Sequence, residues 1–248
     1  MATVISVINH KGGTGKTTST LNIGAGLAHR GKKVLLIDID PQANLTEGLG
    51  VRDNPDTIYD SLSKNIPLPV IPVGENLSLV PSSLDLVGVE LELVSKMSRE
   101  TFVKKLLAPI KDDYDFILFD CPPSLGLLTI NALVPSDVIL IPLEAEYYAY
   151  RGIDRIVGII KNVREHFNPE LKIAGVFLTK CNPQRILTKD IRDSVKQYFG
   201  ANLLDTYIRV NVSLAEAPAV GKDIFSYAPD SNGATDYGKL IDEILTKI

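Results

Sequence analysis

The ten residues from Asn9 to Thr18, N-H-K-G-G-T-G-K-T-T, constrain the fold of this chain more than any other stretch. They follow the apolar run Val4–Ile8 and precede a helical pattern that begins near Lys16, so we expect a strand, a glycine-rich loop and a helix in succession. Glycines at 12, 13 and 15 permit backbone conformations that a Cβ forbids, so consecutive N–H groups can face one anion. The N-terminus of the following helix adds free N–H groups and the positive end of its dipole. The stretch therefore predicts a phosphate-binding loop.

The polar side chains of this loop fit the binding of a nucleotide. Lys16 would reach the β- and γ-phosphates, and the Thr17 hydroxyl would ligate Mg²⁺. The strict pattern G-x-x-x-x-G-K-[ST] is not met, because His10 stands at the position of its first glycine. An additional lysine, Lys11, stands at the head of the loop instead. The predicted nucleotide contacts of the loop are Lys11, Gly12, Gly13, Thr14, Gly15, Lys16, Thr17 and Thr18.

With both lysines in place, the loop resembles the deviant Walker A box of the ParA/MinD family of ATPases, in which Lys11 occupies the position of the signature lysine. The resemblance implies an α/β fold of the P-loop NTPase type, with a doubly wound, mostly parallel sheet flanked by helices. It also implies ATP and Mg²⁺ as cofactors and an ATPase activity that is weak alone and stimulated by a partner. It extends from Val4 to about Leu245, so we expect a single ParA-type ATPase domain over residues 1–248.

Two further apolar strands are expected to end in carboxylates beside the loop. Lys33–Gln42 is apolar up to Asp38 and Asp40, and Asp115–Pro123 is apolar up to Asp120. Strands that are apolar on both faces belong in a covered parallel sheet, which places ligands at the C-terminal ends of its strands. Asp38 and Asp40 would share one side of their strand and repel each other unless a metal or a lysine lies between them. Asp120 fits the Walker B arrangement, in which a carboxylate reaches Mg²⁺, usually through water.

The family resemblance assigns roles to these acids and to Lys11. D-I-D-P-Q at 38–42 resembles the D-x-D-P-Q box of ParA-type proteins, which implies that Asp40 positions or activates the attacking water and that Asp38 holds the Mg²⁺ shell. Lys11 would cross to the nucleotide of a facing subunit, so that two ATP molecules are sandwiched in a homodimer. The D-x-P-P-S string from Asp120 is a candidate γ-phosphate sensor. The predicted catalytic residues are Lys11, Lys16 and Asp40, and the predicted metal ligands are Thr17, Asp38 and Asp120.

A second long resemblance lies near the C-terminus. Residues 211–222, N-V-S-L-A-E-A-P-A-V-G-K, resemble the N-x-x-L-x-E-A-P-x-x-G-K segment of chromosomal and plasmid ParA proteins. Adenine recognition in that family comes from the loops after the last strands, which makes Asn182, Arg209 and Asn211 candidate nucleotide contacts. Ser213 departs from the family pattern, because DNA-binding members often carry arginine there, so one expected phosphate contact is missing.

Cations gather in the second half of the chain, although the whole chain carries a net charge of −4. Between residues 151 and 200, ten Lys/Arg stand against five Asp/Glu. Four of these cations, spaced 4, 3 and 4 residues apart, would stack on one face of a helix. Such a stripe is typical of a solvated helix surface, and it equally fits binding to DNA phosphates without sequence preference, as in ParA-type proteins. The candidate DNA-binding residues are Arg185, Lys189, Arg192 and Lys196.

Periodicity and composition describe the rest. We expect a helix from Lys16 to His29, an irregular surface segment from Thr46 to Pro72 with a short helical patch, and a later helix. The inward face of that later helix is predicted to be Ile153, Val157, Ile160 and Val163. With 45% apolar and 23% charged residues, no apolar run near ~20 residues and no basic-then-apolar N-terminus, we expect a protein that stays in the cytoplasm.

These features favour a ParA-type switch as the function. By the resemblance, the ATP-bound form dimerises and coats nucleoid DNA. It is released when a ParB-like centromere-binding or cargo-adaptor protein stimulates hydrolysis, and plasmid, chromosome or protein cargo is thereby moved.

A MinD-like ATPase that cycles on membranes is the main alternative. It requires a basic amphipathic helix at the C-terminus. Residues 238–248 carry two acids and two lysines, so we interpret them as an ordinary packing helix and expect no membrane partner. An iron–sulfur carrier would need cysteines that bridge a cluster between subunits. Cys121 and Cys181 do not match that arrangement and are predicted to be buried small residues.

Overall fold

Seven strands form one sheet in the order β3-β4-β2-β5-β1-β6-β7. The computed structural model describes residues 2–248 apart from 53–54, 95, 146–151 and 183–185, and for residues 186–190 it describes the backbone alone. Neighbouring strands are parallel throughout, except for the antiparallel pair β3 and β4 at one edge. The strands are β1 (Thr3–Val7), β2 (Val34–Asp38), β3 (Ile71–Gly74), β4 (Leu77–Val80), β5 (Phe116–Asp120), β6 (Val138–Glu144) and β7 (Lys172–Thr179).

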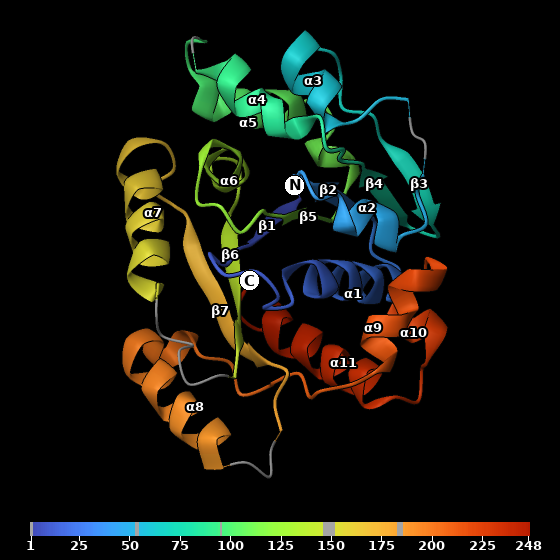
Figure 1. Cartoon of the computed structure of the whole chain (residues 1–248), viewed down its shortest axis with the longest axis vertical. Helices are drawn as coiled ribbons and strands as arrows, with labels where there is room; N and C mark the ends of the chain where they lie inside the picture. Colours follow the sequence, from blue (N-terminus) through green and yellow to red (C-terminus); the bar gives the residue numbers. More distant parts are fainter. Residues whose placement is uncertain (1, 53–54, 95, 146–151, 183–185) are drawn as a thin grey trace.

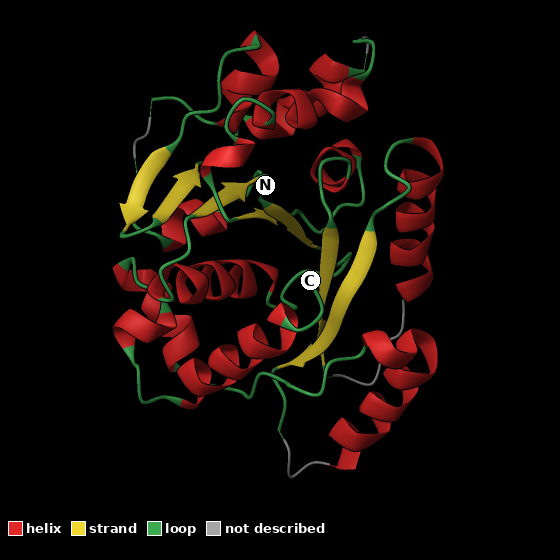
Figure 2. Ribbon diagram, turned by 180° about the vertical axis from the view of Figure 1, so that it is seen from behind, coloured by secondary structure: helices red, strands yellow, loops and turns green. Residues whose placement is uncertain are grey.

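Helices cover both faces of this sheet, as Figures 1 and 2 show from opposite sides. α1, α10 and α11 supply buried residues to the core on one face, and α3 to α8 supply them on the other. The α-helices are α1 (Lys16–His29), α2 (Asn44–Gly48), α3 (Ile58–Lys64), α4 (Leu86–Leu93), α5 (Phe102–Leu107), α6 (Leu127–Leu133), α7 (Ile153–His166), α8 (Ile186–Phe199), α9 (Ser213–Glu216), α10 (Ile224–Tyr227) and α11 (Asn232–Leu245). The predicted doubly wound α/β fold is confirmed.

The central strands are buried on both faces because successive side chains enter opposite cores. In β2, Leu35 and Ile37 join the core under α3 to α8, whereas Val34 and Leu36 join the core under α1 and α11. β1, β2, β5 and β6 are parallel, so their C-terminal ends meet at one edge of the sheet. Loops that carry polar side chains at these ends are therefore brought together.

Two expectations about local structure were wrong in part. The short helical patch expected between residues 46 and 72 is confirmed as α3, but the segment is more ordered than predicted, because it also contains most of α2 and the start of β3, and Thr46 itself is buried. The inward face of α7 uses Ile156, which is fully buried, in place of Val157, which is 46% exposed. The other three predicted positions are confirmed, and Ile153, Ile156, Ile160 and Val163 follow the 3-4-3 spacing of a packed helix.

The C-terminal helix packs as expected. Tyr237, Leu240 and Ile241 of α11 are buried against α1. Within the part of the chain that the structure describes, no helix combines the length and the apolar character needed to cross a bilayer. Both cysteines are buried thiols outside any disulfide.

Candidate nucleotide site

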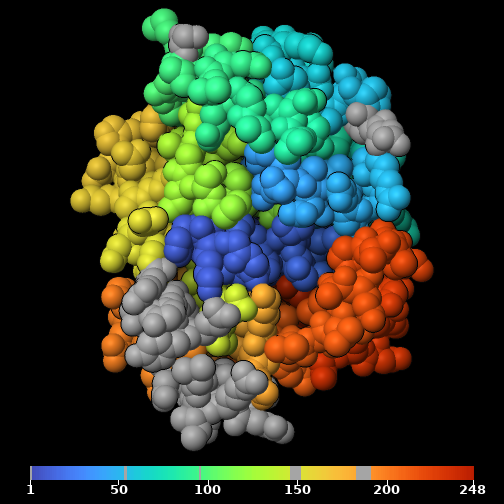
Figure 3. All heavy atoms as spheres, in the orientation of Figure 1, coloured from blue at the N-terminus to red at the C-terminus, as the bar shows by residue number. Residues whose placement is uncertain are grey.

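The glycine-rich loop joins the end of β1 to the start of α1. Gly13 and Gly15 adopt left-handed backbone conformations, with φ of 76° and 88°. A Cβ added at Gly12 would meet no atom within 4 Å, so that part of the loop faces open space. Figure 3 shows the dark-blue segment that contains this loop at the surface, between the lighter blue residues around α2 and the orange-red C-terminal segment. The loop therefore joins a strand to a helix N-terminus and is partly open to solvent, as an anion-binding loop requires.

Two neighbouring strands hold the loop in place. The Asn9 side chain donates to the Pro142 carbonyl of β6 at 2.7 Å and accepts from the Lys11 backbone N–H at 3.0 Å. The Thr179 hydroxyl at the end of β7 donates to the Thr14 carbonyl at 2.8 Å. The loop conformation is therefore set by the sheet rather than by the loop alone.

Lys16 is folded back over the loop. Its side chain is buried, and its ammonium donates to the Lys11 carbonyl at 3.1 Å. Burial lowers the pKa of Lys16, while the carboxylates of Asp120 and Asp40 act in the opposite direction. The lysine predicted to bind phosphate therefore lies among acids at the mouth of the loop. Lys11 is half-buried and lies at the loop's head.

Asp38 is buried and held by its own chain. One carboxylate oxygen accepts from the backbone N–H and the hydroxyl of Thr46, at 2.9 and 2.7 Å, and the other accepts from the Asp40 backbone N–H at 3.1 Å. Burial raises the pKa of Asp38 to about 7, although the Thr46 hydrogen bonds counteract that rise. Asp38 therefore anchors α2 and the turn that carries Asp40, a role that the sequence did not indicate.

Asp120 ends β5 as the Walker B pattern predicted. Burial raises its pKa, the charge of Asp38 adds to the rise, and the Thr17 hydroxyl opposes it. Its Oδ2 is a buried oxygen with no hydrogen-bond partner among the described residues. A hydrated Mg²⁺ fits this arrangement, because it takes oxygen ligands and keeps most of its waters. Across the described residues no three His, Cys, Asp or Glu side chains are close enough to hold a metal by themselves, so the Thr17 hydroxyl and phosphate oxygens would complete such a site.

Two adjoining cavities extend from the loop. The first has a volume of about 530 Å³ and is lined by the loop glycines, Lys16, Thr17 and Asp40. The second, about 240 Å³, is lined by Arg209 and Asn211 and is more apolar, as a base site would be. Both contain Lys180, which has a φ of 52° and pairs with Glu144 at 3.0 Å.

The three candidate adenine contacts do not all line the same cavity. Arg209 and Asn211 line the second one, but Arg209 also forms a two-oxygen ion pair with Asp236, the shorter contact being 2.6 Å. Asn182 belongs to the lining of neither cavity. Sequence reasoning missed Lys180, Thr46 and Ser82, whose hydroxyl donates to the Asp40 carbonyl at 2.8 Å. The only available signal for Lys180 was its place directly after an apolar strand.

The structure describes only part of the predicted cationic stripe. Arg185 and the side chain of Lys189 lie outside the described residues. Arg192 pairs with Asp205 at 2.6 Å, and Lys196 lies in the last turn of α8. Ile191, Val195 and Phe199 are buried and form the inward face of α8.

Comparison with known proteins defines the class to which this fold and site belong. A family model described as an AAA domain matches residues 2–173. A crystal structure titled cobyrinic acid a,c-diamide synthase from Mycobacterium smegmatis, with bound ATP analog and magnesium, is 31% identical. It has a TM-score of 0.88 and covers 99% of this chain and 95% of that one. The class is thus that of P-loop ATPases with a doubly wound sheet.

Curated relatives narrow the class to one family. The sporulation initiation inhibitor protein Soj of Bacillus subtilis is 44% identical over 98% of both chains. The chromosome-partitioning ATPase Soj of Treponema pallidum is 43% identical over 100% of this chain and 98% of its own. The chain belongs to the Soj/ParA family of partitioning ATPases.

Proposed function

We propose that this protein is a partitioning ATPase that binds ATP with Mg²⁺ in the cradle of Gly12 to Thr18, dimerises on ATP, and binds DNA without sequence preference. The observation that carries the proposal is that Lys16 and Asp40 line one open cavity beside the left-handed glycine loop, with the buried Asp120 close enough to act on the charge of Lys16. The family membership supports a role in chromosome or plasmid partitioning. The continuous sheet supports a single ATPase domain over residues 1–248.

Each side chain of the nucleotide site has its own proposed role in ATP hydrolysis. Lys16 offers a buried cation to the β- and γ-phosphates, where it would offset charge that builds during phosphoryl transfer. Asp40 lines the phosphate cavity and is held by Ser82 and by its own turn, which suits the positioning of an attacking water. When bound, Mg²⁺ neutralises phosphate charge and would be held by the Thr17 hydroxyl, with Asp120 and Asp38 behind it.

The proposed dimerisation depends on Lys11. It stands at the opposite end of the loop from Lys16, and the Lys16 ammonium donates a hydrogen bond to the Lys11 carbonyl. We infer that the Lys11 side chain reaches the nucleotide of a facing copy, as an arginine finger does in trans. ATP would then form part of the interface of a homodimer.

The cations of α7 and α8 support the proposed DNA contact. Arg192 and Lys196 lie on α8, and Arg155 and Lys161 lie on α7. Arg185 and Lys189 belong to the same proposal. Binding that rests on such contacts would neutralise phosphates and weaken steeply with salt. The proposed partner is a ParB-like centromere-binding or cargo-adaptor protein that stimulates hydrolysis, and action on DNA places the protein in the cytoplasm with the nucleoid.

Light scattering with ATP and Mg²⁺ tests the dimeric mechanism. Asp40→Ala keeps both lysines and loses the water-positioning carboxylate, so we expect a stable ATP-bound dimer with little hydrolysis. Lys11→Ala should bind ATP yet remain monomeric and hydrolyse poorly. Asp113→Ala and Lys33→Ala, at exposed positions away from the loop, are matched controls. A monomeric Asp40→Ala protein, or a Lys11→Ala protein that dimerises like wild type, would contradict the sandwich.

A further inference from the structure

Lys180 stands where the two cavities of the nucleotide site meet. Five residues line both cavities, namely Gly15, Thr18, Lys180, Leu214 and Ala215. Of these five, Lys180 alone carries a charge. A nucleotide with its base in the smaller cavity and its terminal phosphates beside Lys16 in the larger one would place its α-phosphate at this junction, because the α-phosphate joins the ribose to the other two phosphates. Lys180 is therefore the cation nearest to that expected position.

The ammonium of Lys180 lies over the phosphate loop. A Cβ built on Gly13 would lie 3.9 Å from Lys180 Nζ. Lys16 approaches the loop from α1, whereas Lys180 approaches it from the end of β7. A phosphate held by the loop would thus find cations of its own chain on two sides, and hydrogen bonds from a cation to phosphate are stronger than neutral ones.

The backbone of Lys180 is held in an unfavourable conformation. Its φ of 52° lies in the left-handed region, which a residue with a Cβ seldom adopts. On one side, the Thr179 hydroxyl donates to the Thr14 carbonyl of the loop at 2.8 Å. On the other side, the Cys181 backbone N–H donates to the Ile208 carbonyl at 2.9 Å. Such conformations persist where the surroundings enforce them, and they are concentrated at functional sites.

Glu144 is positioned to compete with a nucleotide for the same ammonium. Glu144 Oε1 at the end of β6 lies 3.0 Å from Lys180 Nζ. The Glu144 side chain is 15% exposed and that of Lys180 is 51% exposed, so the carboxylate is the more enclosed partner. An ion pair this exposed is weak, and a lysine ammonium on its flexible stem can turn to another acceptor. A phosphate in the junction could therefore displace Glu144.

We propose that Lys180 binds the α-phosphate of the nucleotide and that Glu144 is a positioning residue that competes with this phosphate for the lysine. Because ATP and ADP share the α-phosphate, Lys180 strengthens the binding of both without distinguishing them. Glu144 weakens the binding of both, because its pair with Lys180 is broken when the lysine turns to the phosphate. The pair thereby sets how tightly substrate and product are held. This inference rests on the proposed function in taking an adenine nucleotide as the ligand.

Inhibition constants of ATP, ADP, AMP and adenosine against a fluorescent ATP analogue test the assignment. Lys180→Met should weaken ATP, ADP and AMP by the same factor, roughly tenfold, because each loses a charge-assisted hydrogen bond to its α-phosphate. Adenosine has no phosphate and should bind the variant like wild type. Lys180→Arg keeps the charge at the same left-handed position and should retain most of the affinity.

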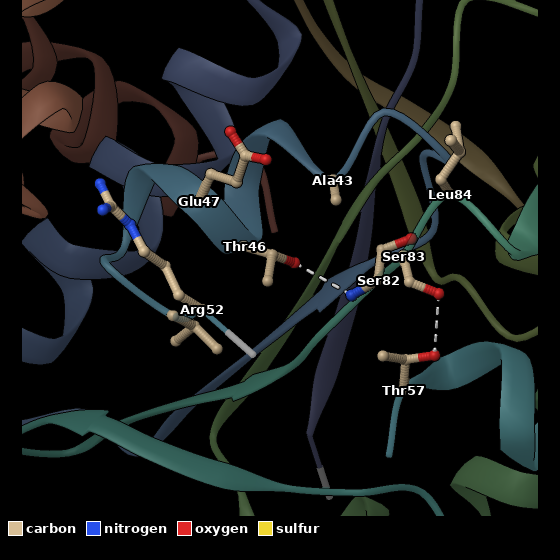
Figure 4. A pocket seen from close by; sticks show the side chains of 9 residues that line it. Ala43, Thr46, Glu47, Arg52, Thr57, Ser82, Ser83 and Leu84 are labelled. Atoms are coloured by element: carbon tan, nitrogen blue, oxygen red, sulfur yellow. Dashed lines mark hydrogen bonds between the residues drawn. The ribbon is translucent and has the colours of Figure 1, made fainter. Parts of the chain in front are cut away.

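Arg52→Met is the matched control, because it removes a cation from a neighbouring cavity. That cavity, of about 550 Å³, is also lined by Glu47 and by the hydroxyls of Thr46, Thr57 and Ser82 (Figure 4). Among the described residues, its lining has no member in common with the two nucleotide cavities. All four inhibition constants should therefore match those of wild type.

Glu144→Gln separates competition from a purely structural pair. If Glu144 competes with the phosphate, the variant should bind ATP, ADP and AMP about threefold more tightly, as expected from loss of an exposed ion pair. The same change should have no effect in a chain that already carries Lys180→Met. If the pair only joins β6 to β7, Glu144→Gln and Lys180→Met should both weaken binding, and that result would overturn the proposal.

The pattern across the ligands supplies the remaining outcomes. Equal constants for wild type and Lys180→Met would overturn the proposal while leaving the proposed function intact. A loss confined to ATP would also overturn it, because Lys180 would then act on the γ-phosphate. If the constants changed as expected but wild type failed to hydrolyse ATP, the proposed function would fail and the assignment of Lys180 would stand.

Discussion

The two ends of the helical layer formed by α3 to α8 differ in their exposed side chains. On the flank of α3 and α4, α4 exposes Val87, Leu91 and Glu92 and carries no cation, although Lys64 of α3 is also exposed. On the flank of α7 and α8, exposed side chains include Arg155, Lys161 and Lys196. Figure 1 shows α4 at one end of the molecule and α8 at the other, with the start of α1 between them. The net charge of −4 conceals this division.

The difference bears on the proposed function, because a polyanion would bind to the cationic flank. Each flank has a contact near the nucleotide site: His10 of the loop lies against Gly152 just before α7, and Ser82 just before α4 donates to the Asp40 carbonyl. Changes at the loop should therefore affect both flanks, and changes on one flank should leave the other intact.

The largest effect is expected for Lys16→Ala, which removes the buried cation of the nucleotide loop. Loss of a hydrogen-bonded charge at a buried site costs about 3 kcal/mol, so ATP affinity should fall by roughly a hundredfold. The fold should survive, because among the described residues the Lys16 side chain forms one hydrogen bond, to the Lys11 carbonyl. Titration with a fluorescent ATP analogue and circular dichroism check both points, with Lys33→Ala as the control. Normal nucleotide affinity in this variant would mean that the loop does not bind the phosphates of ATP.

Gly152→Ala should show how the cationic flank is joined to the loop. Gly152 has a φ of 88°, and a Cβ there would overlap the His10 ring. We expect a loss of about 1–3 kcal/mol in the free energy of unfolding, measured by urea denaturation, together with weaker ATP binding.

His10→Ala in the same chain provides the control for this steric account. Removal of the ring should recover part of the lost stability, while the backbone strain at position 152 persists. No recovery in the double variant would mean that the two residues are not coupled.

Lys196→Ala tests the cationic flank alone. Removal of one phosphate contact should weaken binding to duplex DNA of any sequence and reduce the slope of log affinity against log salt by about 1. Lys104→Ala, an exposed lysine of α5 on the other flank, should change neither quantity.

Arg192→Glu is expected to weaken DNA binding more than Lys196→Ala does. It also breaks the Arg192–Asp205 pair, so Asp205→Asn should accompany it as a control. Identical salt slopes for all variants would mean that the cationic stripe is a solvated helix surface and does not bind DNA.

The smallest effect is expected for Glu243→Gln, which tests how the cationic flank is anchored. Glu243 of α11 accepts from the backbone N–H groups of Asp205 and Thr206, at 2.7 and 2.8 Å. Partial burial acts to raise the pKa of Glu243, but these hydrogen bonds outweigh it and the pKa is lowered. A carboxyl with a lowered folded-state pKa contributes stability above its unfolded pKa and loses that contribution as the pH falls.

Urea midpoints at two pH values measure this contribution. Wild type should be slightly more stable than Glu243→Gln at pH 7, and the difference should shrink toward pH 3.5. Glu75→Gln, at an exposed position near β3, should show no such pH dependence. A difference that is constant with pH would assign the effect to packing rather than to charge.

Local chemistry allowed much of the fold and the phosphate loop to be predicted. The buried strand, the left-handed glycines and the helix follow one another in consecutive residues, so a linear pattern was enough to predict them. The end of β5 at Asp120 was predicted in the same way, from an apolar run that stops at an acid. The strand order could not be read in this way. It depends on which buried strands pair, and that is a contact between distant residues.

The missed features are those that depend on tertiary contacts. Thr46 looked like the start of a loop, because its hydrogen bonds to Asp38 and Ser82 are invisible in a linear pattern. The pairing of Arg192 with Asp205 joins a helix to the segment that follows it, so the stripe alone could not show which cations are engaged. Lys180 reaches the cavity only because β7 lies beside β6.

The two outer edges of the sheet have a consequence for self-assembly. At one edge, β3 carries Pro72, which lacks an N–H, and its register with β4 shifts between Pro72 and Gly74. At the other edge, residues 203–209 pair with the outer side of β7, where Leu204 and Ile208 donate to Val176 and Leu178. Both features interrupt the ladder that a strand from another molecule would need, so strand exchange and fibre growth are disfavoured. Under the proposed function, copies gathered on DNA would therefore associate through their faces rather than through their sheet edges.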